Sequence, residues 1–331
     1  MNTYALLANP GHNRVYFQGS KTLSLAELAL LSPSLSVPCF DFDCAEYGGI
    51  LYYTWQCNAP LPQDDIDKIY NASSAYALFA ITADETFKPL SRQQKPLFDE
   101  KLTTLLKYTG KTNELFTKLL VNIAVCTHGG RPKTLFDPVA GKGTTLFEGL
   151  SRGLSVFGCE IAEAAAQDGI IYFKKFLETE KIKHKTHTEK RSGTGYKSKI
   201  SHFILNHGQV LAMATGNSRF ADSLFGKRKF DLIVGDLPYG VAHGNVGRVV
   251  QSGKTRNPRE LLTECLPSWL ATLKPNGVMV LAWNTHVFSR ASMLNILTEH
   301  GLQVQDQDVY AQFTHRVDQA ILRDIVVAKK Q

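Results

Sequence analysis

The stretch Asp137-Pro138-Val139-Ala140-Gly141-Lys142-Gly143-Thr144 follows a short apolar run and decides the fold of this 331-residue chain. We expect a strand to end at its aspartate, two glycines to frame a turn, and a helix to begin at its threonine. Such a turn sets free helix amides at the carboxyl end of a strand, where they favour an electron-rich ligand. Glu160 closes the next apolar run. An acid there can accept both ribose hydroxyls of a nucleoside cofactor, so the pattern predicts a cofactor site.

The turn has three other interpretations. A dinucleotide fingerprint needs a third glycine where Phe147 stands, and a phosphate-binding P-loop needs Ser or Thr where Gly143 follows Lys142. The third is an ordinary glycine-rich turn without a ligand. Asn217 follows a later apolar run, where a side chain commonly meets an adenine ring, although a solvent-facing turn asparagine is the alternative. The residues predicted to bind the cofactor are Asp137, Pro138, Ala140, Gly141, Gly143, Thr144, Glu160 and Asn217.

A second motif, Asp236-Leu237-Pro238-Tyr239-Gly240, follows the apolar run 231–235. The amino groups of nucleic-acid bases are poor nucleophiles because their lone pair is delocalised, so a catalyst must hold the nitrogen in line and accept its N–H bonds. Asp236 offers a carboxylate, and Pro238 keeps Leu237 extended so that its carbonyl is a second acceptor. Tyr239 offers a flat face for stacking a base. With the cofactor turn, these four residues predict methyl transfer to a planar amine; an ordinary Asp-x-Pro turn is the alternative.

The periodicity predicts two domains, 1–85 and 111–331, joined by a linker over 86–110. The first has the order β-α-β-β-α-β of a ferredoxin-like module, and Ser24-Leu25-Ala26-Glu27 predicts a capping box at a helix start. The second alternates helix and strand, which predicts a parallel sheet with helices on both faces. Residues 303–313 and 319–328 read as two strands with a short turn, so they must pair antiparallel. This α/β plan is usual for Rossmann-like S-adenosylmethionine-dependent methyltransferases.

The charge is unevenly distributed. The net charge of +7 and a pI of about 9.0 favour a polyanionic partner without proving one. Residues 174–199 hold nine lysines and arginines against three glutamates, and the loop 248–259 is basic without an acid. A solvated loop is the alternative for the first stretch. The residues predicted to contact nucleic acid are Lys181, Lys183, Lys185, Arg248, Lys254 and Arg256.

Several classes of protein are disfavoured. Six cysteines are scattered without a Cys-x-x-Cys pair, which argues for a reducing compartment such as the cytoplasm and against a zinc or iron–sulfur site. No apolar run is long enough to span a bilayer, and the first residues lack the basic region of a secretion signal. We therefore expect neither a metal nor a membrane partner.

Together the two motifs resemble the RNA methylase family that includes the THUMP-domain tRNA guanosine-N2 methyltransferases. The likeness covers about 111–331, and residues 23–28 resemble the start of that family's N-terminal ferredoxin-like module. The family's Asp-Pro-Pro-Tyr clamp corresponds to residues 236–239, with Leu237 in place of the first proline. Between Thr82 and Lys111 there is no room for a THUMP domain, the family's usual holder of the tRNA acceptor end. The grip on tRNA would then fall to the basic stretch or to an accessory protein subunit.

The resemblance implies an S-adenosylmethionine-dependent N-methyltransferase that acts on an exocyclic amine, guanine N2 first, in tRNA or other structured RNA. Three alternatives stay open at this point. The same clamp serves adenine N6 or cytosine N4 methylation in DNA, and an amide side chain of a protein is another planar nitrogen. A non-catalytic RNA-binding protein with a methylase fold is the third.

Overall fold

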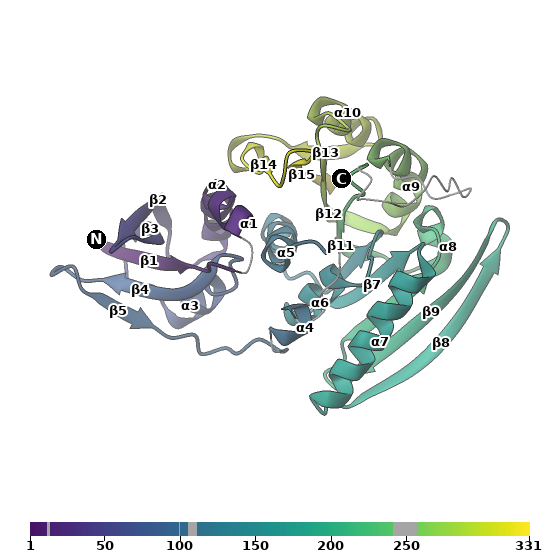
Figure 1. Ribbon diagram of the computed structural model, residues 1–331, viewed down its shortest axis with the longest axis horizontal. Coiled ribbons are helices and arrows are strands. Elements are labelled where there is room, and N and C mark those ends of the chain that lie inside the picture. The colour runs from purple at the N-terminus through teal and green to yellow at the C-terminus, as the bar shows by residue number, and fades with distance from the viewer. Residues whose placement is uncertain (12–13, 99, 105–110, 241–256) are drawn as a thin grey trace.

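The computed structural model describes residues 1–11, 14–98, 100–104, 111–240 and 257–331, which fold around two sheets (Figure 1). The smaller sheet has the strand order β2-β3-β1-β4-β5, and the larger has the order β13-β15-β12-β11-β6-β7-β10-β9-β8, with β14 paired to β15. Each sheet carries its own hydrophobic core, so the chain has two structural units.

The N-terminal unit is ferredoxin-like, as predicted. Its strands β2, β3, β1 and β4 lie side by side and pair antiparallel. Two adjacent glycines with positive φ, Gly48 and Gly49, make the tight turn between β2 and β3. The elements are β1 (Asn2–Ala8), α1 (Arg14–Gly19), α2 (Lys21–Leu31), η1 (Ser32–Ser34), β2 (Cys39–Tyr47), β3 (Ile50–Cys57), α3 (Gln63–Ile69) and β4 (Ala75–Ile81). A further strand, β5 (Phe87–Leu90), pairs with β4 inside the segment predicted to be a linker.

The predicted capping box is wrong. Helix α2 already begins at Lys21, so Ser24 lies inside the helix. The carboxylate of Glu27 is buried, accepts bonds from the amide and hydroxyl of Ser73, and accepts a third at 2.6 Å from Asn122 on α5 (Glu114–His128). Burial raises the pKa of Glu27, against the opposing effect of these bonds. Glu27 thus ties the N-terminal unit to α5 instead of capping its own helix.

The second unit is a mostly parallel sheet with helices on both faces. Strands β10, β7, β6, β11 and β12 run parallel, and β15 joins β12 antiparallel. One face is covered by α5, α6 and α7, and the other by α8, α9 and α10. The elements are α4 (Lys101–Thr104), β6 (Thr134–Asp137), α6 (Thr144–Ser151), β7 (Ser155–Glu160), α7 (Glu163–Thr179), β10 (Val210–Thr215), η2 (Ser218–Phe220), α8 (Ala221–Phe225), β11 (Phe230–Asp236), α9 (Pro258–Thr272), β12 (Leu273–Asn284), α10 (Arg290–Glu299), β13 (Leu302–Gln305), η3 (Asp308–Ala311), β14 (His315–Arg316) and β15 (Leu322–Lys330). The predicted Rossmann-like α/β fold, a parallel sheet that ends in an antiparallel strand, is confirmed.

The C-terminal pair of strands differs from the prediction in length. β13 and β15 pair antiparallel, as predicted, but β13 ends at Gln305 instead of continuing to residue 313. Polar residues 306–308 follow, and Asp308 adopts a positive φ of 52°, which ends the extended conformation and opens η3. The sheet therefore stops where the apolar alternation stops.

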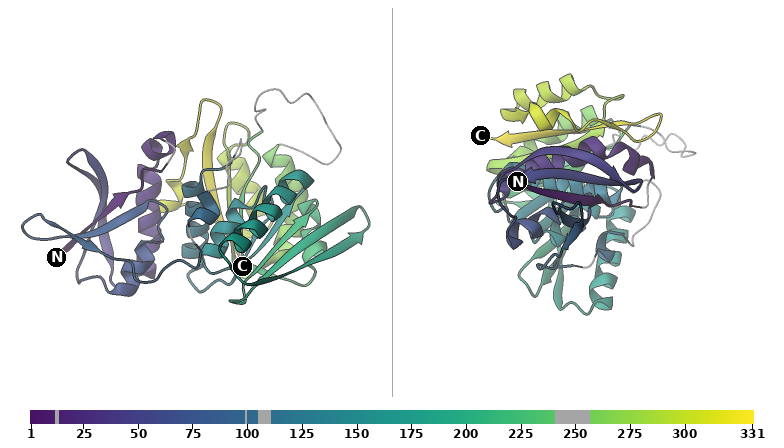
Figure 2. Two further views of the ribbon diagram at one scale, coloured as in Figure 1. Left: turned by 60° about the horizontal axis from the view of Figure 1, so that its bottom comes forward. Right: turned by 90° about the vertical axis from the view of Figure 1, so that its left-hand side faces the viewer.

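The basic stretch 174–199 is not a loop. Its first residues belong to α7, and the rest forms a long hairpin of β8 (His184–Gly193) and β9 (Tyr196–Leu205), which adds two strands to the sheet beyond β10 (Figure 2). Phe203 packs on Phe173 of α7 with ring centroids 5.1 Å apart, while Ile200 enters the core on the opposite face. The alternation of Ser198, Ile200 and the residues after it, behind a Gly-Thr-Gly turn, is the signal for this hairpin.

Candidate functional site

Four predicted site residues meet at one edge of the larger sheet. Asp236 ends β11, Asp137 ends β6, Glu160 ends β7, and Asn217 lies two residues beyond β10. These four strands are neighbours in the order β11-β6-β7-β10, and all run in the same direction. After β6 the chain continues to β7 on one side of it in the strand order, and it later returns to β11 on the other side. Ligands of α/β sheets bind at such a switch point, at the carboxyl ends of the strands.

The predicted cofactor turn has the geometry that its glycines suggest. Gly141 and Gly143 have φ of +53° and +94°, values that L side chains adopt only with strain. The amide of Gly143 donates to the carbonyl of Ala140 at 2.7 Å, and Thr144 is the first residue of α6. Ala140 is in turn tied to β7 through its amide, which donates to Cys159 at 3.0 Å. The turn is thus held from both sides.

A glycine on α7 supports this turn, and the sequence analysis missed it. A Cβ on Gly169 would collide with the backbone carbonyl of Lys142, so α7 packs directly on the turn. The ammonium of Lys142 also forms an ion pair with Asp168 at 2.6 Å. A glycine in the middle of a helix, where alanine is more stable, is the signal that could have found this contact.

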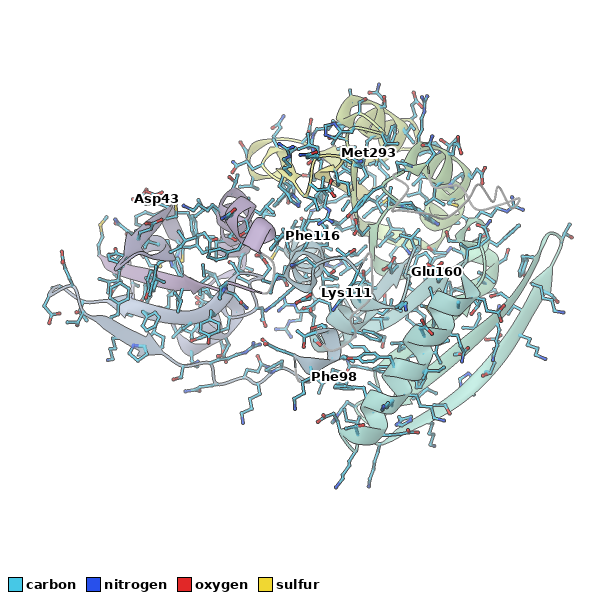
Figure 3. The ribbon with its side chains drawn as sticks, in the orientation of Figure 1. Asp43, Phe98, Lys111, Phe116, Glu160 and Met293 are labelled. Atoms are coloured by element: carbon cyan, nitrogen blue, oxygen red, sulfur yellow. The ribbon has the colours of Figure 1, made fainter. Side chains whose placement is uncertain are left out.

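Glu160 lies at the end of β7, beside α7 (Figure 3), and is hydrogen-bonded to the turn. One carboxylate oxygen accepts the amide of Gly141 at 2.9 Å, and the other accepts the amide of Ala162 at 2.6 Å. Each carboxylate oxygen can accept more than one hydrogen bond, so both retain capacity for a ligand. Two backbone donors from the site itself therefore orient this carboxylate.

Asp137 is the most buried acid of the site, with 2 % of its surface exposed. Burial raises its pKa to about 7, the amide of Val139 at 2.9 Å opposes that shift, and the charges of Glu160 and Asp236 add to it. A cation that approached this carboxyl group would favour its ionised form. Asp137 is thus a group whose protonation responds to a charged ligand near neutral pH.

Two other predicted residues of the cofactor set have mainly structural partners. The side chain of Asn217 accepts the amide of Arg219 at 3.0 Å and caps η2, which leaves its own amide group for other contacts. Pro138 lies in the turn and packs against Gly235 of β11, where the two backbone segments approach closely. Both positions are at the predicted edge, and their contact with a cofactor stays a prediction.

The carboxylate of Asp236 is occupied by hydroxyl groups. The phenol of Tyr239 donates to its two oxygens at 2.6 and 2.8 Å, and Thr112 donates to one of them at 2.6 Å. Thr112 precedes α5 and stands 124 residues away, so no local pattern could have pointed to it. Leu237 donates its amide to Ala282 at 2.8 Å, and no described residue donates a hydrogen bond to its carbonyl oxygen. The clamp therefore holds two acceptors, one bonded to hydroxyl groups and one to which no described residue donates.

The ring of Tyr239 is packed against a buried cation. The guanidinium of Arg323 on β15 lies 5.0 Å from its centroid and 4.1 Å from the ring centroid of Phe116. Arg323 is 5 % exposed, and no described residue accepts a hydrogen bond from its Nε. Burial and the adjacent Asp236 raise the pKa of Tyr239, so its hydroxyl stays protonated and donates. The sequence analysis missed Arg323 because it sits within an apolar strand.

The predicted nucleic-acid contacts divide into two groups. Lys181 and Lys183 lie in the turn after α7 and Lys185 lies near the start of β8, at the edge of the sheet opposite the clamp. Arg248, Lys254 and Arg256 lie outside the described residues. Within the described ranges no helix is long and apolar enough to cross a membrane, and no three metal-binding side chains gather in a cluster.

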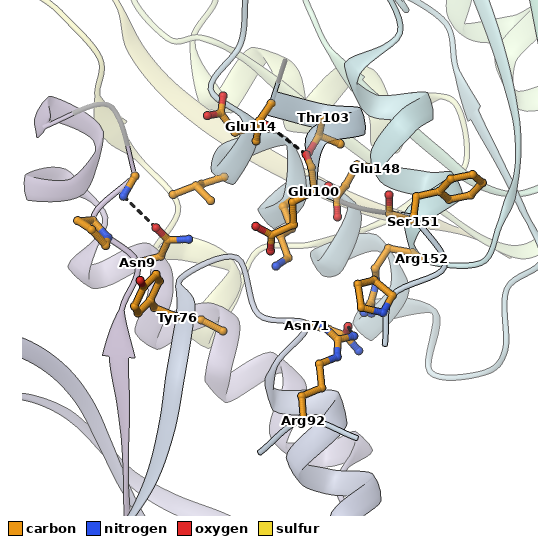
Figure 4. Close-up of a pocket in the computed structure, with 18 residues that line it drawn as sticks. Asn9, Asn71, Tyr76, Arg92, Glu100, Thr103, Glu114, Glu148, Ser151 and Arg152 are labelled. Carbon is orange, nitrogen blue, oxygen red and sulfur yellow. Dashed lines mark hydrogen bonds between the residues drawn. The ribbon is translucent and has the colours of Figure 1, made fainter. Parts of the chain in front are cut away.

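A separate cavity of about 500 Å³ lies between the N-terminal unit and helices α5 and α6 (Figure 4). Its walls carry charges of both signs, including Arg92, Lys118, Glu148 and Arg152. The burial of Glu148 raises its pKa. Helix α6 begins at the cofactor turn and ends at this cavity, so the cavity lies at the far end of the helix from the turn.

Comparison with known proteins gives a likeness of fold. No protein-family model and no curated protein sequence matches the chain. Among solved structures, TrmN from Thermus thermophilus is 12 % identical, with all of both chains covered and a TM-score of 0.49. An rRNA methylase from Streptococcus thermophilus is 8 % identical over 64 % of this chain and 96 % of its own (TM-score 0.36), and a ribosomal protein L11 methylase from Lactobacillus delbrueckii subsp. bulgaricus is 14 % identical over 65 % and 80 % (TM-score 0.37). At such identities, function must be argued from the residues of this chain.

Proposed function

We propose that this chain is an S-adenosylmethionine-dependent methyltransferase that modifies an exocyclic amine of a base in structured RNA. The observation that carries the proposal is the row of Asp236, Asp137, Glu160 and Asn217 at the ends of four adjacent parallel strands. Asp137, Glu160 and Asn217 suit a nucleoside cofactor, and Asp236 suits a planar amine.

The residues of the turn fit the cofactor. Glu160 offers two oriented carboxylate oxygens to the ribose hydroxyls, and the glycines let the backbone approach the ligand closely. Asp137, whose pKa lies at about 7, suits a cationic neighbour such as an amino or sulfonium group. Bound S-adenosylmethionine would supply a methyl group on a positively charged sulfur, from which a nucleophile can take it.

The clamp then orients the acceptor. A planar amine would replace the hydroxyls of Tyr239 and Thr112 at Asp236 and donate its second N–H to the carbonyl of Leu237. As the nitrogen gains a methyl group it becomes positively charged and must lose a proton. Asp236 stabilises that charge and accepts the proton, which then passes to solvent. The ring of Tyr239 is the surface on which the base would stack.

The assignment of RNA, and of guanine N2 within it, follows from charge and from the resemblance of the clamp. The net charge of +7 and the basic hairpin favour a polyanion, and the clamp resembles that of the tRNA guanosine-N2 methyltransferases. DNA amines and protein amides present a similar planar nitrogen, so the experiment must offer all of these substrates. A non-catalytic RNA-binding protein would bind RNA without transferring a methyl group.

The test is methyl transfer from tritium-labelled S-adenosylmethionine to separate pools of unmodified tRNA transcripts, rRNA, DNA and protein. We expect label in the tRNA pool and N2-methylguanosine on nucleoside mass spectrometry, with no transfer by the Asp236→Asn variant. Label only in DNA or only in protein would refute the RNA assignment. RNA binding without label in any pool would favour the non-catalytic interpretation.

A further inference from the structure

The hairpin β8–β9 extends beyond the edge of the sheet that carries the candidate site. Thr215, the last residue of β10, pairs with Lys199 on β9 and with Glu160 on β7. Residues 191–198 lie farther along the hairpin, so its tip projects past the carboxyl ends of the parallel strands (Figure 2). The tip therefore lies at the same end of the sheet as the cofactor turn and Asp236, with β7 and β10 between β9 and the strand that precedes the turn.

Three lysines share one face of this tip. Lys199 lies directly opposite Lys190, and Lys197 lies opposite Ser192, two pairs nearer the turn. Alternate residues of a strand point to the same face, so the three side chains form a strip. The pairing also places Glu160, Thr215, Lys199 and Lys190 in one row across four strands. With strands about 4.8 Å apart, the backbones of Lys199 and Lys190 lie roughly 10 and 14 Å from that of Glu160.

The hairpin alone gives no reason for this strip. Like charges directly opposite each other destabilise a sheet, as Lys190 and Lys199 must do here. All three lysines are exposed, and no described acid forms an ion pair with them. Glu189, the single acid of the hairpin, is already engaged by Arg191 at 2.6 Å and by His202 at 3.5 Å. The charge of the strip is left for an external anion.

The other face of the tip holds it in place. Tyr196 packs on Phe220 of η2 with ring centroids 5.0 Å apart, and the hydroxyl of Ser198 donates to the carbonyl of Thr215 at 2.7 Å. Ile200 is 1 % exposed in the core beneath α8 and α9. One face is thus anchored next to Asn217 while the lysines on the opposite face are free to contact a ligand.

We propose that Lys190, Lys197 and Lys199 bind the sugar–phosphate backbone of the RNA a few nucleotides from the one that enters the clamp, because β9 lies four strand spacings, about 19 Å, from β11 and Asp236. The proposal rests on the proposed function and specifies how its substrate is held. It also separates these residues from Lys181, Lys183 and Lys185 at the base of the hairpin. Five residues of strand, about 17 Å, part Lys185 from Lys190, and the base lies at the opposite edge of the sheet.

The experiment compares two triple variants that remove the same charge. One replaces the tip lysines (Lys190→Ala, Lys197→Ala and Lys199→Ala), and the other replaces the base lysines (Lys181→Ala, Lys183→Ala and Lys185→Ala). The probe is a fluorescein-labelled, unmodified tRNA transcript, and its Kd is measured by anisotropy over a series of KCl concentrations. S-adenosylmethionine affinity by calorimetry and thermal unfolding are measured in parallel.

We expect the tip variant to bind the transcript roughly 10- to 100-fold more weakly at 100 mM KCl. Its plot of log Kd against log salt should be shallower by about two, because each phosphate contact contributes roughly 0.7–0.9 to that slope. The base variant should lie within about twofold of wild type. The tip variant should unfold no earlier than wild type, because a like-charge pair is removed, and cofactor affinity should not change.

If the two variants weaken transcript binding equally, or the base variant weakens it more, the assignment of the lysine strip to RNA binding is refuted. A tip variant that methylates RNA with wild-type kcat/KM and salt slope would refute it as well. These results differ from failure of the proposed function, in which the wild-type chain transfers no methyl group to any RNA. A tip-dependent grip on duplex DNA, with no binding of the transcript, would assign the strip to DNA and refute the RNA partner.

Discussion

The two halves of the candidate site hold their carboxylates in different ways. Glu160 is oriented by backbone amides, those of Gly141 and Ala162. Asp236 is covered by side-chain hydroxyls, those of Tyr239 and Thr112. A backbone donor cannot leave without unfolding its turn, whereas a hydroxyl moves away by rotation about single bonds. The difference suggests that the cofactor half is fixed and that the acceptor half must open.

This difference suits the two ligands proposed here. A cofactor is the same molecule in every cycle, so a preformed site loses little free energy in ordering itself. An amine on a base must first displace the hydroxyls from Asp236. Each such hydrogen bond contributes only about 1 kcal/mol net, and the incoming N–H groups replace it. The resting contacts thus keep a partly buried carboxylate satisfied until a substrate arrives.

The largest expected effect is at Asp236. We predict that Asp236→Ala lowers kcat by on the order of 10²- to 10⁴-fold, because both charge stabilisation and the proton acceptor are lost. The affinity for S-adenosylmethionine should stay within about twofold, since Asp236 acts on the amine. Single-turnover transfer and calorimetry on the same preparation measure the two quantities. Wild-type activity in a folded variant would rule out the clamp mechanism.

The next effect is at Glu160. Glu160→Ala should weaken S-adenosylmethionine binding by about 1–3 kcal/mol, because ribose hydroxyls and two backbone amides lose their acceptor. Glu160→Gln keeps one acceptor oxygen and should lose less. Calorimetric titration of both variants distinguishes them, and kcat at saturating cofactor should change less than in Asp236→Ala. Unchanged affinity in Glu160→Ala would remove Glu160 from the cofactor site.

The parallel strands of the larger sheet and the turns that follow them could be predicted, because short apolar runs and glycines mark them in the sequence. The runs that became β6, β7, β10 and β11 are bounded by turns, so their ends, and with them the site edge, could be placed from sequence. The basic hairpin was not predicted because the lysines on the exposed face of β9 conceal its apolar alternation. Burial of one face, which decides that the stretch is a strand, depends on α7 and is invisible locally.

Tertiary contacts account for the other differences. The pattern Ser24-x-x-Glu27 is a good capping box by itself, but Ser73 and Asn122 claim the glutamate in the folded chain. Thr112 and Arg323 reach the clamp from segments that are remote in sequence, before α5 and on β15. A single sequence carries no record of such pairings, so the partners of a predicted residue are harder to predict than the residue itself.

A smaller effect is expected at Tyr239, and it tests whether the acceptor half opens. Tyr239→Ala should lower kcat/KM by a factor equivalent to about 1–3 kcal/mol, because stacking of the base is lost. Tyr239→Phe keeps the ring and should be far milder, because the hydroxyl contacts Asp236 only before the amine arrives. Thr112→Val, which removes the other hydroxyl, is the matched control. If the Phe and Ala variants are equally impaired, the hydroxyl itself takes part in transfer and the opening model fails.

The smallest expected effect is the release of a fraction of a proton from Asp137 on cofactor binding. It tests whether the charge of the cofactor changes the pKa of a carboxyl group in the fixed half of the site. Burial raises the pKa of Asp137 to about 7, so the free protein is partly protonated there at neutral pH. A cationic cofactor lowers that pKa, and binding should therefore release up to about half a proton near pH 7 and less at pH 8.5. Calorimetry in buffers of different ionisation enthalpy measures the release, and Asp137→Asn should abolish it.

Asp137 also links the free energy of unfolding to pH. Between about pH 4 and 7 the folded chain holds more protons at this group than the unfolded chain, so the stability that it contributes falls as pH rises. Glu27 and Glu148, whose pKa values are also raised, contribute in the same direction, so only the difference between wild type and Asp137→Asn isolates this residue. A wild-type protein that releases no proton across this window would show that the cation of the cofactor does not approach Asp137.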